Sequence, residues 1–224
     1  MNLDKQKAYR LINSKFPPIA IFDDSADEED FEYLYALQSL TNPRLQNETG
    51  DISLIPLSDI PYGIKGCSYA TAPFTHINKS GTRFSNADFG LLYLAENWET
   101  AIAETLHHTQ AILTNIPDLH FDVIVMRGLV ASFSGNVLDI RADTLDTMNS
   151  SPIYDEHDYS FSQLFGAKYR GVYDGLLYTS VRNPMSDCYA LYTPKLIHEI
   201  IQSTHYEYIW DGNFISVRQI SSAT

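Results

Sequence analysis

Four polar side chains stand in mostly apolar surroundings and have the types needed to bind and process a phosphate-bearing ligand. They are Arg83, Tyr93, Glu104 and Ser180. The guanidinium of Arg83 can bind phosphate oxygens through two parallel hydrogen bonds. The hydroxyl of Ser180 can donate to a phosphate, and a partly desolvated carboxylate such as Glu104 is typical of an active-site acid. Together these residue types indicate an anion-binding catalytic site.

Each of these residues also has a structural interpretation that involves no chemistry. An arginine after a turn is commonly exposed, and a tyrosine in a strand commonly packs in the core. A glutamate on a helix commonly faces solvent, and a serine at a strand end can satisfy the backbone of a turn. Residue type alone therefore leaves both interpretations open.

A helix must hold Glu104 beside the other three residues. Residues 98–114 are predicted to form that helix, because Asn97 is a suitable N-cap. Side chains three or four positions apart share a helix face, so Ala101, Glu104 and His108 form one ridge. The small side chain of Ala101 leaves room for a ligand beside Glu104.

The rest of the chain alternates predicted strands with short helices and turns. Residues 1–60 are predicted to be an N-terminal helical segment packed on the core, with a helix capped by Ser25. Strands are predicted at residues 89–94, 121–133, 137–140, 176–182, 188–194 and 206–217, and further helices at 160–170 and 195–203. Neither a repeat nor a linker divides the chain. The expected fold class is α+β: a single mixed domain with a central β-structure and flanking helices.

The charge balance limits the partners of the chain. Its formal net charge is −13, and the sequence has no block of Lys and Arg. Nucleic-acid binding requires basic residues that neutralise phosphates, so no direct nucleic-acid contact is expected. An acidic surface instead suits a basic partner. The few arginines become informative, because an anionic substrate needs a local concentration of them.

Signals for disulfides, metals and targeting are sparse. Cys67 and Cys188 are not spaced as a zinc motif and are predicted to be buried, reduced thiols. Glu104 and His107 form one Glu-x-x-His pattern, but a di-iron site needs that pattern twice, so no metal is expected. The N-terminus lacks the hydrophobic region of a signal peptide, and no apolar run is long enough to span a membrane. A cytoplasmic protein without membrane contact is expected.

The order of these motifs resembles the RES family, which is named for its Arg, Glu and Ser. The family core resembles, in order, Arg83-Phe84-Ser85 and residues 90–95, 99–105, 178–182 and 188–191. Stretches around Tyr9-Arg10, Asn42-Pro43 and residues 208–212 resemble one subgroup of that family, so the resemblance covers nearly the whole chain. It identifies residues 61–224 as the RES domain.

The resemblance implies a fold, a reaction and a partner. RES proteins are similar in fold to ADP-ribosyltransferase toxins, and characterised members are toxins paired with Xre-type antitoxins. Some of them degrade NAD by cleaving its nicotinamide–ribose bond with phosphate or water as acceptor. NAD and phosphate would then be substrates, and no prosthetic group is implied. The antitoxin would cover the site and supply the DNA binding, in a complex in which the toxin can form a homodimer.

The same resemblance implies a role for each site residue. Arg83 would contact the NAD diphosphate or the attacking phosphate, and Tyr93 would position the ribose that carries nicotinamide. Glu104 would bind the ribose hydroxyls and stabilise the positive charge that develops as nicotinamide leaves. Ser180 would bind phosphate, and Arg182 is a further candidate for substrate binding.

One residue of the family pattern is missing from its expected place. Many RES proteins carry an additional Arg upstream, near the strand that opens the domain, whereas residues 61–69 contain none. The candidate substitutes for substrate binding are Lys65, Tyr69 and His76. A lysine is a point charge rather than a planar fork, so the resemblance supports NAD cleavage more firmly than phosphorolysis.

Two other functions stay open at this level. The chain could transfer ADP-ribose to a protein, which the sequence does not separate from NAD degradation. It could also be a non-enzymatic, acidic partner of a DNA-binding protein. An adaptor, however, has no reason to hold these four residue types in this order.

Overall fold

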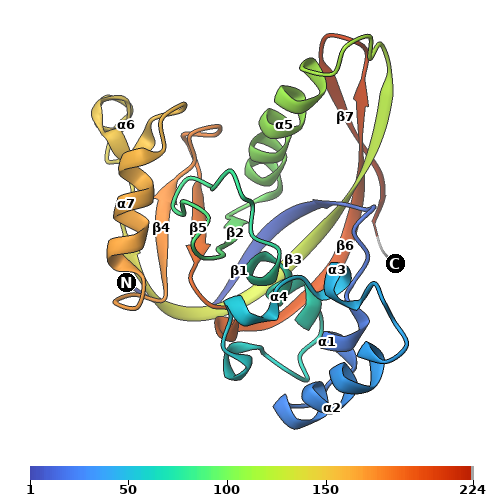
Figure 1. Ribbon diagram of the computed structural model, residues 1–224. Coiled ribbons are helices and arrows are strands. Elements are labelled where there is room, and N and C mark those ends of the chain that lie inside the picture. The colour runs from blue at the N-terminus through green and yellow to red at the C-terminus, as the bar shows by residue number, and fades with distance from the viewer. Residues whose placement is uncertain (223–224) are drawn as a thin grey trace.

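The computed structural model describes residues 1–222, with side chains described through residue 220. Seven strands form one sheet in the order β1-β2-β5-β4-β3-β6-β7 (Figure 1). They span Asn2–Asn13 (β1), Leu92–Ala95 (β2), Asp122–Asp139 (β3), Gly175–Thr179 (β4), Asp187–Leu191 (β5), Ile197–Trp210 (β6) and Ile215–Ser222 (β7). Helices flank this sheet, so the predicted mixed α+β class with a central sheet is confirmed.

The helices gather in three places around the sheet (Figure 1). The first four lie together at one end, α5 lies beside the long strands, and α6 and α7 lie outside β4. Their bounds are Ala20–Asp24 (α1), Glu28–Ser39 (α2), Leu45–Thr49 (α3), Cys67–Thr75 (α4), Trp98–Thr114 (α5), Leu145–Ser150 (α6) and Ser160–Tyr169 (α7). The predicted helices at 98–114 and 160–170 are therefore confirmed.

The long strand β3 holds the two halves of the sheet together. It pairs antiparallel with β1 and β6, and its last residues pair parallel with β4. β1 also pairs with β2 at Tyr9 and Ala95, so the sheet curls back on itself. This closure brings β2, β4 and β5 close to the N-terminal strand, and these are the strands that carry or flank the four polar residues.

Two apolar clusters form the core. One lies under α1–α4 and includes the stacked rings of Phe22 and Phe31. The other lies around β2, β4 and β5 and includes Phe84 packed edge-on against Tyr178, with their ring centroids 5.0 Å apart. The second cluster supports the backbone on which the candidate site is built.

The prediction that the chain begins with a helical segment is wrong for its first residues. Asn2–Asn13 is strand β1, which is hydrogen-bonded along β3. The charged residues between Asp4 and Lys7 hide the strand pattern, since strand preference depends on packing against neighbouring strands more than on composition. Helices follow only from Ala20 onward, and β1 makes the N-terminal segment part of the central sheet.

The helix predicted at residues 195–203 is also wrong. Residues Ile197–Trp210 form β6, which pairs with β3. Ile197 and Ile200 are both buried although three positions separate them, a spacing that suggests a helix. The pairing shifts register between Ser132 and Phe133 of β3, and such a bulge lets both side chains face the core.

Two other expectations about the elements have clear outcomes. The strands predicted at 121–133 and 137–140 are one continuous strand, β3. Cys67 and Cys188 are buried free thiols, as predicted. In the part of the chain that the structure describes, none of the helices has the length and apolar character required to cross a membrane.

Candidate active site

A hydrogen bond joins Glu104 to Ser180, which lie on different elements. Ser180 Oγ donates to Glu104 Oε1 at 2.6 Å. Ser180 is fully buried directly after β4, and its Oγ accepts the backbone N–H groups of Arg182 and Asn183 at 3.2 and 3.0 Å. Since two N–H groups polarise the hydroxyl, it is oriented as a donor to the carboxylate. The half-buried Glu104 is therefore held by one of its two oxygens.

A polar network fixes the β4–β5 loop, residues 180–186, against the start of α5. Asn97 caps α5, because its Oδ1 accepts the backbone N–H of Thr100 at 2.8 Å. The same Asn97 donates from Nδ2 to Ser186 Oγ at 2.8 Å, and Asn183 Nδ2 donates to Thr100 Oγ1 at 2.8 Å. One asparagine thus starts the helix that carries Glu104 and holds the loop that carries Ser180.

Replacing Asn97 by Ala is expected to cost more than an ordinary helix cap. Loss of a cap costs about 1 kcal/mol, and the loss of the bond to Ser186 should bring the total decrease in the free energy of unfolding to about 2 kcal/mol. Urea unfolding of the variant measures this decrease. Thr144→Ala is the matched control, because Thr144 caps α6 and, among the described residues, its side chain hydrogen-bonds only to Thr147. Equal losses in the two variants would show that the loop contact contributes nothing.

Tyr93 on β2 ties the Arg83 segment to the sheet. Its hydroxyl accepts the backbone N–H of Phe84 at 3.1 Å and shares a 2.9 Å hydrogen bond with Thr82 Oγ1. Burial raises the pKa of Tyr93 to about 12, against the smaller opposite effects of these hydrogen bonds. The phenol is therefore neutral at physiological pH and acts as a polar anchor rather than as a base.

Arg83 is half-buried and faces the segment that precedes α7. Its Nη1 donates to the backbone carbonyls of Ile153 and Asp155 at 3.3 and 2.9 Å. The guanidinium carbon lies 4.7 Å from the centre of the Tyr159 ring, a cation–π contact. Ser162 of α7 donates to the backbone carbonyl of Arg83 at 2.6 Å, so this helix holds the main chain of the arginine in place.

Arg182 lies in the β4–β5 loop, and only 12% of its side chain is exposed. Its Nη1 pairs with the carboxylate of Glu156, which belongs to the same segment that Arg83 contacts. Its Nη2 is buried and has no hydrogen-bond partner among the described residues. Arg182 therefore retains an unsatisfied donor beside Ser180.

Electrostatic interactions connect these residues into one group. Partial desolvation lowers the pKa of His108 on α5, Glu104 opposes this effect, and Arg182 and Arg83 add to it. Together these effects favour the neutral form of the imidazole. Burial, and then Glu104, raises the pKa of Cys188, so that thiol is protonated and inert as a nucleophile.

The structure thus brings together five of the predicted site residues: Arg83, Tyr93, Glu104, Ser180 and Arg182. Buried Tyr178 links the two halves of the group, because Glu104, Tyr93 and Arg83 all influence its pKa, after the dominant effect of burial that raises it.

Of the three proposed substitutes for an upstream arginine, two have side-chain partners elsewhere, and the side chain of Lys65 is exposed. Tyr69 Oη accepts a hydrogen bond from Arg127 at 2.8 Å. His76 Nε2 lies 2.9 Å from the backbone carbonyl of Glu48. Among the interactions of the described residues, none joins these three side chains to Glu104 or Ser180.

Arg10 is a site candidate that the sequence analysis missed. It lies on β1, the first strand of the chain, and its Nη1 donates to the Tyr93 carbonyl at 2.7 Å. Burial lowers the pKa of Arg10 to about 10, which leaves the guanidinium charged at neutral pH. The available signal is an arginine between Tyr9 and Leu11 in a short apolar run, which a helical prediction for this segment does not single out.

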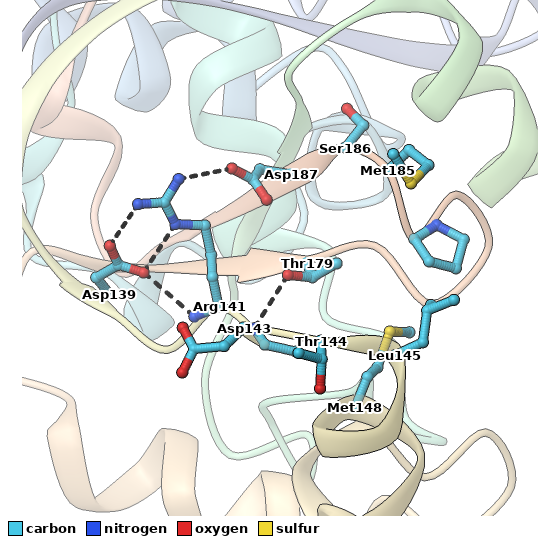
Figure 2. A pocket seen from close by; sticks show the side chains of 12 residues that line it. Asp139, Arg141, Asp143, Thr144, Leu145, Met148, Thr179, Met185, Ser186 and Asp187 are labelled. Carbon is cyan, nitrogen blue, oxygen red and sulfur yellow. Dashed lines mark hydrogen bonds and ion pairs between the residues drawn. The ribbon is translucent and has the colours of Figure 1, made fainter.

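One pocket lies beside this group rather than over it. Its volume is about 710 Å³, and it is lined by the end of β3, by α6 and by the β4–β5 loop. Figure 2 shows Arg141 in this pocket, where its guanidinium pairs with Asp139 at 2.7 Å and Asp187 at 3.1 Å. Because two carboxylates already occupy that guanidinium and Glu104 does not line the pocket, we place the active site elsewhere.

A second pocket, of about 510 Å³, has Glu156 and Val181 in its lining, next to Arg182 and Ser180.

Among the described residues, no group of three or more His, Cys, Asp or Glu side chains is arranged to hold a metal ion.

Comparison with known proteins gives three matches. The family model described as the RES domain matches residues 60–211, more than half of the chain. "Uncharacterized protein y4oC" of Sinorhizobium fredii is 30% identical over 213 residues, which cover 95% of this chain and 86% of that protein. The crystal structure of the M. tuberculosis MbcT-MbcA toxin-antitoxin complex contains a chain with a TM-score of 0.38 and 13% identity, which covers 55% of this chain and 72% of that one.

Proposed function

The chain belongs to the RES domain family, and on that basis we propose that it is the toxin of a toxin–antitoxin pair and degrades NAD. It cleaves the bond between nicotinamide and ribose, with phosphate or water as the acceptor. The observation that carries the proposal is the hydrogen bond from Ser180 to Glu104, because it fixes a carboxylate in a group that also contains Arg83 and Arg182.

Glu104 stabilises the transition state of this reaction. Cleavage of an N-glycosidic bond leaves positive charge on the sugar, and a fixed carboxylate nearby stabilises that charge. The electrons of the broken bond leave with nicotinamide, which departs as a neutral molecule and needs no proton. Ser180 holds Oε1, and no described residue donates a hydrogen bond to Oε2. That second oxygen is the one available to a ribose hydroxyl.

The acceptor completes the reaction by forming a bond from its oxygen to the ribose carbon. Water gives ADP-ribose and releases a proton to solvent, whereas phosphate gives ADP-ribose-1″-phosphate. The arginines hold the anionic groups of either reaction, since a guanidinium binds phosphate oxygens in pairs. Their concentration in one place offsets the repulsion that a chain of net charge −13 exerts on an anionic substrate.

We also propose an Xre-type antitoxin as the partner. A DNA-binding antitoxin is basic where it contacts phosphates, and the acidic surface of this chain suits such a protein. The antitoxin covers the group formed by Arg83 and Glu104 and thereby blocks NAD. It also provides the contact with DNA that this chain does not make.

The test is NAD turnover by the purified chain, with and without phosphate, and identification of the products by mass spectrometry. We expect free nicotinamide either with and without phosphate or only when phosphate is present. ADP-ribose-1″-phosphate that appears only with phosphate identifies a phosphorylase, and ADP-ribose regardless of phosphate identifies a hydrolase. The same assay with bound antitoxin should show a block. Intact NAD under all conditions contradicts the proposal and directs attention to a protein target for ADP-ribose.

A further inference from the structure

Glu156 occupies the position that faces Arg182 in the candidate site. Its carboxylate pairs with Nη1 of that arginine. The two partners differ in burial: 12% of the Arg182 side chain is exposed, against 51% for Glu156. The arginine is thus fixed by its surroundings, whereas the glutamate can turn out into solvent. A ligand that competes for the guanidinium would displace Glu156 and not Arg182.

The same segment also contacts the other arginine of the group. The carbonyls of Ile153 and Asp155 accept hydrogen bonds from Arg83, and the Tyr159 ring stacks on its guanidinium. Carbonyls and a ring leave the charge of Arg83 in place, but the carboxylate of Glu156 neutralises that of Arg182. Within this segment, Glu156 is therefore the carboxylate that forms a direct ion pair with an arginine of the site.

The hydrogen bonding of Arg182 is incomplete. Its Nη2 is buried without a partner among the described residues, while Nη1 is used by Glu156. A phosphate or diphosphate group offers several oxygens and can engage both nitrogens at once, which is the preferred geometry of a guanidinium. Such a group therefore gains a hydrogen bond that Glu156 does not make here.

From this geometry we infer that Glu156 is a specificity-determining residue: an internal counter-ion of Arg182 that a phosphate group must displace. Because an incoming anion must replace the ion pair, Glu156 weakens the binding of every anion to Arg182. Phosphates and diphosphates still bind, whereas anions that interact more weakly with a guanidinium do not. The inference rests on the proposed function only for the identity of the natural ligand as NAD or phosphate. The exchange of anions on Arg182 itself requires no reaction.

Titration calorimetry of the full chain with inorganic pyrophosphate tests this inference. Glu156→Gln removes the competing charge and keeps the size of the side chain, and we expect it to lower the Kd for pyrophosphate about fivefold, as expected for a partly exposed ion pair. Arg182→Gln should weaken binding. In the Arg182→Gln background, Glu156→Gln should have no effect, because the two changes act on one contact.

Glu29→Gln is the matched control for net charge. Glu29 is exposed on α2, so this substitution removes the same charge at a position outside the candidate site. An unchanged or higher Kd in Glu156→Gln would overturn the inference. So would an equal decrease in Glu29→Gln, or the absence of pyrophosphate binding in both the natural chain and Glu156→Gln.

The result is separable from that of the NAD assay. If Glu156→Gln binds pyrophosphate more tightly but the natural chain leaves NAD intact, the proposed function is wrong and the inference about Glu156 holds. If the natural chain cleaves NAD but Glu156→Gln has an unchanged pyrophosphate affinity, the proposed function holds and the inference is wrong.

Discussion

Glu104→Gln should reduce NAD cleavage about 100-fold or more, because the neutral amide no longer stabilises positive charge on the ribose. The amide oxygen still accepts the hydrogen bond from Ser180, so the local structure is expected to persist. Nicotinamide release by the purified variant measures the loss, and growth of cells that express it should no longer be arrested. The thermal unfolding midpoint of the variant shows whether the fold is intact.

Glu99→Gln is the control for this experiment. Glu99 lies in the first turn of the same helix and is exposed, so the same chemical change occurs outside the group that contains Ser180. Its activity should stay close to that of the natural chain. If Glu104→Gln retained full cleavage, or if both variants lost it equally, the assignment of Glu104 to transition-state stabilisation would be wrong.

Gly166→Ala should be among the most destabilising substitutions in the chain, with a loss of about 3 kcal/mol in the free energy of unfolding. A Cβ at this position would lie 2.0 Å from the backbone carbonyl oxygen of Phe84, which is rigid main chain inside the core. Helix α7 would have to move away from the segment that carries Arg83. Urea unfolding followed by circular dichroism measures the loss.

The consequence for the site follows from the contacts of α7. Ser162 donates to the Arg83 carbonyl and Gln163 Nε2 donates to the Thr82 carbonyl at 3.0 Å, so displacement of α7 should also weaken anion binding. Gly171→Ala is the comparison, because a Cβ there meets no atom within 4 Å and only the positive φ of 80° opposes it. That strain costs about 1 kcal/mol. A smaller loss for Gly166 than for Gly171 would contradict this account of the α7 contact.

The helix that carries Glu104 shows how much local sequence can determine. Asn97 at the predicted N-cap position does accept the N–H of Thr100, and α5 spans the predicted residues. Capping and helical periodicity are local properties, since they depend on residues within one or two turns. For the same reason the helix at 160–170 could be predicted, with an end that differs by one residue.

The N-terminal and C-terminal strands show where local sequence was insufficient. β1 exists because β3 supplies its hydrogen bonds from more than a hundred positions away, and nothing within the segment itself reveals that partner. Local periodicity predicts a helix in place of β6, because a bulge within β6 changes the spacing of its buried residues. The sequence does not reveal the contact of Arg10 with Tyr93 either, since that contact depends on the closure of the sheet.

By itself the sequence determined the family, the mixed fold class and helix α5, and it suggested the residue types of the candidate site, because these depend on motifs and on local periodicity. Only the tertiary structure decided which of the proposed residues meet. It joins Glu104 to Ser180 by a hydrogen bond, whereas Tyr69 and His76 bond to other residues and the Lys65 side chain is exposed. It also places Glu156 against Arg182, a contact between two loops. The reason is physical: contacts between distant segments are set by strand pairing and core packing, which the spacing of residues along a chain does not encode.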